Sequence, residues 1–321
     1  MKAIVYTKYG SPNELKLNEV EKPTPMAKEV LIRVHAASIN SWDWDLLTGT
    51  FQGRLGGFRK PKFNILGCDI AGTVEEVGSD VHQFSPGDNV FGDMSGFKQR
   101  DWGGFAEYAC AREDVIALKS DKMTFEQAAA VPQAGVLALQ GLYDIGNLKS
   151  GQKVLINGAG GGGGTFAIQI AKAAGAEVTG VDGTEKLKAM HSLGCDHVID
   201  YTKEDFTNNG EQYDLILDVI STRSVFAYKR ALSQQGVYVT VGGRTAKLLQ
   251  LALLGPIISG SRKIKLLGHE PTRKDLNTLT KLFEEGKIEP VIDSCYKLSE
   301  AAQAFSHFGE GKFIGKIVIT I

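Results

Sequence analysis

The chain has 321 residues, of which 43% are hydrophobic and 23% are charged, and its formal net charge is -1. This length allows one large or two ordinary domains, and the composition supports a folded core rather than gross disorder. Because the net charge is close to zero, the chain as a whole lacks the excess of positive charge that is typical of proteins that bind nucleic acid or anionic membranes.

Targeting and cysteine patterns point to a cytoplasmic protein. The longest apolar run, Leu248 to Ile258, is too short to span a bilayer, and the N-terminal residues lack the apolar stretch of a signal peptide. The four cysteines are scattered and form no CxxC pair, which argues against a disulfide framework or a cysteine-built zinc module.

The first third of the chain is typical of a small, partly closed antiparallel β-barrel. Short runs rich in Val, Ile and Ala alternate with turn clusters, and no clear three-turn helix is expected before about residue 122. The expected strands are Lys2 to Tyr6, Glu29 to Ala36, Gly72 to Val77 and Asn89 to Gly92.

From Thr124 onward, strands and helices alternate. Thr124 and Gln127 have the spacing of a capping box at the start of an Ala-rich helix. Further helices are expected at Thr165 to Ala174, Lys186 to Leu193 and Val225 to Leu232. The expected strands are Lys153 to Asn157, Glu177 to Val181, His197 to Asp200, Asp214 to Val219, Val237 to Val241 and Ile264 to Leu267. This alternation predicts a doubly wound parallel sheet of the α/β class.

The C-terminal segment predicts how the two parts are connected. A helix is expected at Lys274 to Glu285, and Ser299 is expected to cap a short helix. The final strand, Lys316 to Ile321, has no βα partner, so we assign it to the first barrel. The predicted domains are therefore residues 1-122 with 289-321, and an inserted domain at residues 123-288.

A run of glycines follows the first strand of the predicted parallel sheet. Gly158, Gly161 and Gly164 have GxxGxxG spacing between a strand and a helix, which is typical of a turn that binds the pyrophosphate of a dinucleotide. The helix N-terminus adds free N–H groups and a favourable dipole. The alternative is a merely flexible loop. The residues predicted to contact the cofactor are Gly158, Gly161, Gly162, Gly163, Gly164 and Thr165.

An acidic residue ends the second strand of the same sheet. Asp182 lies 24 positions after Gly158, where a carboxylate commonly binds the adenosine ribose hydroxyls and repels a 2′-phosphate. Glu185 adds a negative charge, whereas Lys186 and Lys188 oppose it. In the alternative interpretation, Asp182 caps the next helix in a solvated turn.

Several segments together resemble the medium-chain dehydrogenase/reductase superfamily. They are the segment from Gly67 to Gly78 with its continuation Phe84 to Val90, Asn40-x-x-Asp43, the glycine run, and the closing Gly315-Lys316-Ile-Val. Within that superfamily the chain resembles the zinc-free quinone oxidoreductase branch. The resemblance covers essentially the whole chain and implies a GroES-like β-barrel domain with an inserted Rossmann domain, and a cofactor cleft between them.

The resemblance also allows a prediction of whether the chain binds zinc. The positions of the Cys, His and Cys ligands of zinc alcohol dehydrogenases correspond here to Asn40, Cys68 and Gln133. One thiol beside two carboxamides is not a zinc site, because zinc needs three good protein ligands plus water. The four-cysteine structural zinc loop, expected near Gly92 to Gly103, is also missing from the sequence. We therefore predict no metal and no Lewis-acid mechanism.

The resemblance assigns few residues to the reaction itself. It places Asn40 against the nicotinamide as an orienting polar group, and it adds Thr184, Lys186, Tyr201 and Gly242 to the cofactor site. A tyrosine that is common in the zinc-free branch corresponds to Phe51 here. Trp42, Trp44 and Phe51 suggest an aromatic wall for a flat substrate, although both tryptophans could instead pack the barrel against the other domain. Asp43 is expected to be structural.

These observations predict an enzyme that transfers hydride from NAD(P)H to a quinone or activated enone. The alternative is a nucleotide-binding protein with little turnover, used for structure or redox sensing. The family tendency is toward NADPH, but Asp182 makes us lean toward NADH. A homodimer is expected through a sheet edge near Tyr238 to Val241 or Ile264 to Leu267. The apolar run Leu248 to Ile258 could lie at the same surface or line the substrate cleft.

Overall fold

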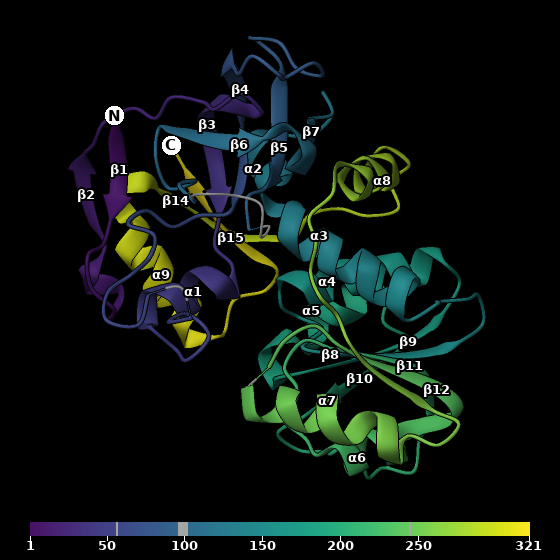
Figure 1. Ribbon diagram of the computed structural model, residues 1–321. Coiled ribbons are helices and arrows are strands. Elements are labelled where there is room, and N and C mark those ends of the chain that lie inside the picture. Colours follow the sequence, from purple (N-terminus) through teal and green to yellow (C-terminus); the bar gives the residue numbers. More distant parts are fainter. Residues whose placement is uncertain (56, 96–101, 244) are drawn as a thin grey trace. The chain divides into compact units, whose positions relative to one another are not determined.

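The computed structural model describes residues 1–55, 57–95, 102–243 and 245–321 (Figure 1). The chain divides into two compact units. The first unit comprises Met1–Gln133, Glu270–Glu285 and Pro290–Ile321, and the second unit comprises Ala134–His269 and Gly286–Glu289. Helix α8 (Arg273–Glu284), which the predicted boundaries assign to the inserted domain, contacts strand β7 (Ile116–Leu118) of the first unit.

The first unit is built around a seven-stranded sheet with the strand order β14-β15-β3-β4-β5-β7, in which β6 also pairs with β3. The other strands of this sheet are β3 (Glu29–Ser38), β4 (Asp69–Val77), β5 (Asn89–Asp93), β6 (Tyr108–Arg112), β14 (Ile292–Lys297) and β15 (Lys316–Thr320). The hairpin of β1 (Lys2–Val5) and β2 (Lys16–Glu19) is separate. Because β15 pairs antiparallel with β3, the assignment of the last strand to the barrel is confirmed.

Helices cover this sheet and close its core. They are α1 (Ser41–Thr48), α2 (Phe125–Ala130), α8 and α9 (Ala301–Glu310), and α3 (Pro132–Leu139) follows α2 directly. The predicted capping box is confirmed, since Gln127 N donates to Thr124 Oγ1 at 3.1 Å and Thr124 N donates to Gln127 Oε1 at 3.0 Å. In the core, the Phe105 and Phe305 rings meet edge to face at 5.7 Å.

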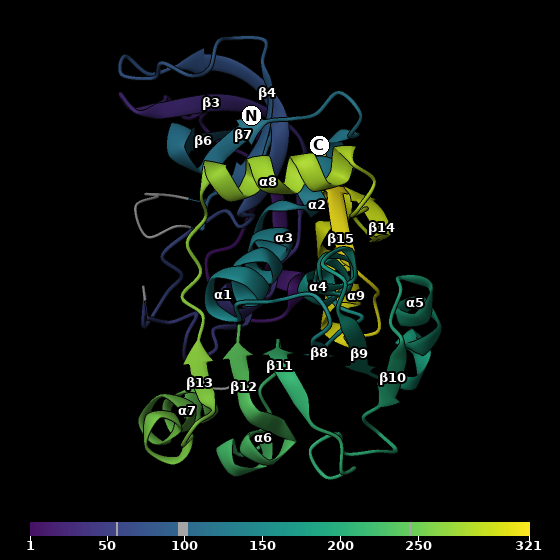
Figure 2. The same cartoon turned by 90° about the vertical axis from the view of Figure 1, so that its right-hand side faces the viewer.

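The second unit contains a six-stranded parallel sheet with the order β10-β9-β8-β11-β12-β13, which Figure 2 shows side by side. The strands are β8 (Lys153–Asn157), β9 (Glu177–Asp182), β10 (His197–Asp200), β11 (Tyr213–Asp218), β12 (Leu232–Thr240) and β13 (Lys263–Leu266). The helices are α4 (Gly162–Ala173), α5 (Leu187–Ser192), α6 (Val225–Ala231) and α7 (Thr245–Ile258). The strand order reverses at β8, so the carboxyl ends of β8 and β11 form the crevice where such sheets bind ligands.

The structure differs from the sequence predictions at the start of one helix, at one cap and at one sheet edge. Helix α4 begins at Gly162, three residues before its predicted start, because the last glycines of the run already have helical backbone conformation. The predicted Ser299 cap is wrong: Ser299 lies inside a short 3-10 helix, Leu298–Glu300, whose N-cap is Lys297. Strand β12 is paired on both sides by β11 and β13, so Tyr238 to Thr240 cannot form a sheet edge.

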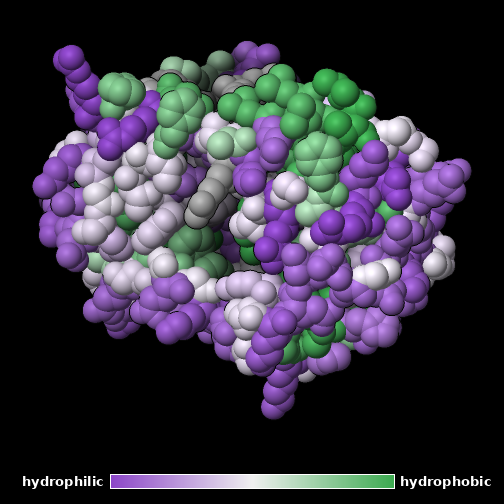
Figure 3. All heavy atoms as spheres, turned by 90° about the horizontal axis from the view of Figure 1, so that it is seen from below, coloured by the Kyte–Doolittle hydropathy of each residue, from purple (hydrophilic) through white to green (hydrophobic). Residues whose placement is uncertain are grey.

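Helix α7 contains the apolar run noted in the sequence. Its Leu249, Leu253 and Ile257 are exposed and recur every four residues. Figure 3 shows a hydrophobic patch at the top of the view. None of the helices in the described ranges combines the length and apolarity needed to traverse a bilayer.

Candidate active site

The glycine turn of the second unit joins β8 to α4. Gly158 has a φ of +84°, a left-handed conformation that favours glycine. The amides of Gly158 and Ala159 donate to Val181 O at 2.9 and 3.1 Å, which ties the turn to the neighbouring strand β9. Gly161 is the N-cap of α4, so the first amides of this helix have no acceptor within the helix itself.

The glycines of this turn have different steric surroundings. A Cβ on Gly164 would lie 2.2 Å from Gly158 O, so this glycine is required for the close packing of helix on turn. A Cβ on Gly161 would meet nothing nearer than 3.5 Å, and one on Gly163 nothing nearer than 3.8 Å. Thr165 is buried, and its hydroxyl donates to Gly162 O. The open side of the turn is therefore at Gly161 and Gly163.

The carboxylate of Asp182, at the end of β9, is bound to the same turn. Its Oδ2 accepts the Gly160 amide at 2.9 Å, and its Oδ1 accepts the Gly183 amide at 2.8 Å. The Lys186 Nζ lies 3.6 Å from Oδ1, and both side chains are buried. Asp182 therefore fixes the glycine turn, and part of its charge is balanced by Lys186.

The remaining residues predicted for the cofactor site lie at the ends of neighbouring strands. Thr184 donates its hydroxyl to Asp200, which ends β10. Tyr201 is exposed, and its amide donates to Asp182 O at 3.2 Å. Gly242 follows β12, and a Cβ there would make only an ordinary contact, with Val219 O at 3.7 Å. The sheet thus brings these predicted residues to the carboxyl ends of β9, β10 and β12.

In the first unit, a buried carboxylate organises the chain after β3. Asp43 has no exposed surface. Its two oxygens accept the amides of Asn40 and Gly67, each at 2.8 Å. Burial raises the pKa of Asp43 to about 7, although both hydrogen bonds favour the charged form. The carboxylate joins the N-terminus of α1 to the segment that leads into β4, as expected for a structural residue.

The three positions that correspond to zinc ligands converge in the fold. Asn40 Nδ2 lies 3.4 Å from Cys68 Sγ, and Gln133 Nε2 lies 3.5 Å from the same sulfur. Burial raises the pKa of the Cys68 thiol well above its ordinary value, and the nearby Asp43 and Asp69 raise it further. Two carboxamide N–H groups therefore face a thiol that has no tendency to ionise.

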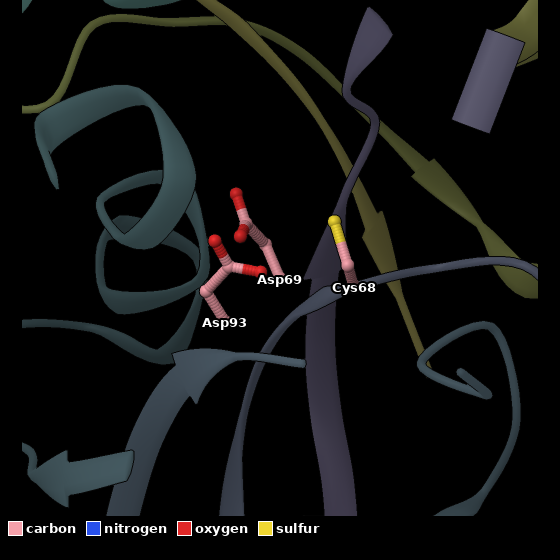
Figure 4. A group of neighbouring side chains, drawn as sticks. All are labelled: Cys68, Asp69 and Asp93. Atoms are coloured by element: carbon pink, nitrogen blue, oxygen red, sulfur yellow. The ribbon is translucent and has the colours of Figure 1, made fainter. Parts of the chain in front are cut away.

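A lysine and two aspartates that sequence reasoning missed complete this cluster. The buried Lys316 Nζ contacts Asn40 Oδ1, Ile39 O at 3.0 Å and Asp69 Oδ2 at 3.4 Å. Asp69 on β4 and Asp93 on β5 are direct cross-strand partners, and Figure 4 shows their carboxylates side by side near Cys68. One feature of the sequence could have indicated Lys316: it is a charged residue at the start of a last strand that is otherwise apolar.

Cys68, Asp69 and Asp93 form the one group of potential metal ligands found among the described residues, with their ligand atoms within 4.8 Å of one another. Their surroundings do not fit zinc. Asp69 Oδ1 accepts the Gln133 amide at 3.0 Å, and Asp93 Oδ1 accepts the Ser95 amide at 2.7 Å. The Lys316 ammonium already places a cation beside Asp69, and the thiol is disposed to stay protonated.

The predicted aromatic residues do not share one face. Trp42 and Trp44 are two positions apart on α1, and side chains with this spacing point to different sides of a helix. Trp44 packs against Phe308, with ring centroids 6.0 Å apart, and a Cβ on Gly309 would lie 2.3 Å from its ring. Trp42 and Phe51 are exposed. Trp44 is partly buried and packs against the core of the first unit.

The predicted location of a structural zinc loop, Gly92 to Gly103, includes residues 96–101, which lie outside the described residues. The absence of cysteines from that segment is a property of the sequence alone.

Comparison with known proteins identifies the family. Residues 26–121 match the alcohol dehydrogenase GroES-like domain, and residues 193–319 match a family described as zinc-binding dehydrogenase. The chain is 35% identical to a 2-methylene-furan-3-one reductase of Solanum lycopersicum, over 99% of this chain and 79% of that protein. It is 32% identical to a chloroplastic NADPH-dependent alkenal/one oxidoreductase of Arabidopsis thaliana, over 99% of this chain and 79% of the relative.

A solved structure agrees with these relatives. The quinone oxidoreductase of Coxiella burnetii superimposes with a TM-score of 0.91 at 32% identity, covering 100% of this chain and 99% of that one. The superposition spans the residues of both units of this chain. The chain is therefore an oxidoreductase of the medium-chain dehydrogenase/reductase superfamily and belongs to its quinone oxidoreductase branch.

Proposed function

We propose that this protein transfers hydride from NAD(P)H to a quinone or an activated enone without zinc. The observation that carries the proposal is the strand–glycine–helix turn at the reversal of the parallel sheet, whose open side at Gly161 leaves room for a pyrophosphate. The names of three relatives support the substrate class. The first is a reductase of a furanone, the second an oxidoreductase of alkenals and enones, and the third a quinone oxidoreductase.

The cofactor supplies the hydride, and the protein binds the reactants, orients them and excludes water from them. Gly161 and Gly163 leave the backbone amides of the turn open to phosphate, and the start of α4 adds its dipole. Asn40 is the polar group that we assign to orienting the nicotinamide or the substrate carbonyl. A reduced quinone is a stabilised anion that can take its proton from water, so a site without a strong acid suits this reaction.

A panel of simple quinones and α,β-unsaturated carbonyl compounds tests this function. We expect steady oxidation of NADH or NADPH, followed at the nicotinamide absorbance, with at least one class of acceptor. Cofactor binding without oxidation of either cofactor by any acceptor would instead support the second candidate, a nucleotide-binding protein with little turnover.

Purified protein is expected to contain no stoichiometric zinc. The reason is the donor set around Cys68, where two carboxamides and the Lys316 ammonium occupy the surroundings that a metal would need. Elemental analysis measures the metal content, and turnover after prolonged chelation measures its importance. One tightly held zinc per chain, with activity lost on chelation, would contradict the assignment.

Asp182 is the residue we expect to favour NADH over NADPH. A carboxylate there can bind both ribose hydroxyls but faces a 2′-phosphate with like charge, although Lys186 at 3.6 Å offsets part of that repulsion. Removing the charge in Asp182→Ser should raise the specificity constant for NADPH relative to NADH by about tenfold, or about 1.4 kcal/mol. Steady-state kinetics with each cofactor measure the ratio of the two specificity constants.

Asp182→Asn is the matched control, because it keeps an oxygen acceptor for the Gly160 amide while removing the charge. Both variants should shift the ratio in the same direction. If the unmodified protein already uses NADPH more efficiently, Asp182 serves the glycine turn alone and does not select the cofactor.

A further inference from the structure

Asp218, at the carboxyl end of β11, is a buried carboxylate with several hydrogen-bond donors around it. Its Oδ1 accepts the Asn157 side-chain amide at 2.8 Å, and Asn157 is the last residue of β8. The same oxygen accepts the backbone amides of Ile220 and Ser221 at 3.0 and 2.8 Å. The other oxygen, Oδ2, accepts the Tyr238 hydroxyl at 2.9 Å. These donors replace the water that burial removes from the charge.

A chain of hydroxyl groups continues from this carboxylate to the end of β12. Tyr238 Oη lies 3.1 Å from Ser221 Oγ, which also contacts Thr240 Oγ1. Thr240 Oγ1 donates to Gly242 O at 2.7 Å, and Asp218 O is farther from it at 3.4 Å. A carboxylate and a carbonyl oxygen can only accept, so the hydrogens of Tyr238 and Thr240 point toward the two ends of the chain. Ser221 donates its single hydrogen between them.

The loop after β11 has a backbone conformation that needs support. Ser221 has a φ of +49°, a left-handed conformation that is uncommon for a residue other than glycine and is often found at ligand sites. A Cβ on Gly243 would lie 2.6 Å from Ser221 Cβ, so this loop is in direct contact with the loop after β12. A Cβ on Gly158 would lie 3.0 Å from Ile220 Cγ1, so the same loop also reaches the glycine turn after β8.

The place of these loops in the sheet indicates which part of a dinucleotide they would contact. A dinucleotide lies across the point where the strand order reverses, with its pyrophosphate on the first glycine turn and its adenosine ribose at the end of the next strand. In this chain those places are the turn at Gly161 and the end of β9 at Asp182. The other half, the nicotinamide and its ribose, then extends over the carboxyl ends of β11 and β12.

We propose that Tyr238, Ser221 and Thr240 are positioning residues, which hold the loops after β11 and β12 in the conformation that binds the nicotinamide half of the cofactor. All three side chains are buried, and their hydroxyl groups act on the backbone of the two loops through the contacts above. The inference rests on the proposed function, since it takes a nicotinamide dinucleotide as the ligand. It extends that function by naming the residues that support this part of the site.

Two substitutions, Tyr238→Phe and Thr240→Val, each remove one hydroxyl group from the chain. Calorimetry measures the dissociation constants of NADH, NADPH and ADP, which carries the adenosine and both phosphates but lacks the nicotinamide half. We expect each variant to bind the dinucleotides at least about tenfold more weakly and to keep its affinity for ADP within about twofold. General damage to the second unit would weaken all three ligands alike.

Two control variants accompany this experiment. Tyr213 is also a buried tyrosine of β11, at the amino end of the strand, where its hydroxyl forms hydrogen bonds with Asn209 and Thr179. Tyr213→Phe should keep the affinities for all three ligands, even where it lowers the unfolding temperature as much as Tyr238→Phe does. Thr240→Ser retains the hydroxyl group and should keep the dinucleotide affinity that Thr240→Val loses.

An equal loss of affinity for ADP and for the dinucleotides, or no loss, in Tyr238→Phe and Thr240→Val would overturn the inference. An unmodified protein that binds NADH and NADPH no more tightly than ADP would overturn both the inference and the proposed function, because the nicotinamide half would have no site. If the two affinities separate as expected in a protein that oxidises neither cofactor, the proposed hydride transfer fails and the inference stands.

Discussion

Gly161→Val is expected to abolish dinucleotide binding while leaving the second unit folded. Gly161 has an extended backbone with a φ of -83°, which valine adopts readily, and its Cβ would meet no protein atom nearer than 3.5 Å. The branched side chain would instead fill the open side of the turn, where the proposed pyrophosphate must approach the backbone. We expect affinity to fall on the order of 100-fold or more, about 2.7 kcal/mol, by calorimetry with NADH and NADPH.

Two further variants give this experiment its controls. Gly161→Ala adds only the Cβ and should weaken binding less than valine does. Gly164→Ala places a Cβ 2.2 Å from Gly158 O and should lower the thermal unfolding temperature, because its glycine serves packing. If Gly161→Val binds both cofactors as tightly as the unmodified protein, the pyrophosphate site lies elsewhere.

The parallel sheet could be predicted because its signals are local in the sequence. Each strand is a short apolar run, and the glycine turn lies directly between a strand and a helix. Five of the six strands of the second unit match their predicted bounds within one residue, whereas β12 begins at Leu232, five residues before its predicted start. The capping box at Thr124 is also as predicted. Helix α1 was missed because it has only eight residues and starts from Asn40 within a polar, aromatic segment.

The polar cluster of the first unit could be predicted only in part, because distant segments form it. The family resemblance brought Asn40, Cys68 and Gln133 together, and the fold places them in contact. Lys316 lies 276 positions from Asn40 and 247 from Asp69, and no local pattern connects them. The aromatic residues illustrate another limit of local reasoning, because the residues around Trp42 and Trp44 are helical and these two side chains therefore point in different directions.

The buried carboxyl of Asp43 should make the stability of the first unit depend on pH. Burial raises its pKa from the ordinary 3.8 to about 7 in the folded chain, so the folded state binds this proton more tightly than the unfolded state does. Protonation therefore favours folding, and the stabilisation develops as the pH falls through 7. Between pH 8 and pH 5.5 the free energy of unfolding should rise by about 2 kcal/mol from this group alone.

Asp43→Asn should remove that dependence and weaken the fold. The carboxamide has a single oxygen for the two amides, those of Asn40 and Gly67, that Asp43 accepts at 2.8 Å, and its NH₂ group would face the other N–H. The cost should be about 1–3 kcal/mol for the unsatisfied donor. Urea unfolding followed by tryptophan fluorescence reports on the first unit, since Trp42, Trp44 and Trp102 all lie in it. Asp121→Asn, at an exposed position, is the control and should keep the pH dependence; an equal slope in Asp43→Asn would show that another group is responsible.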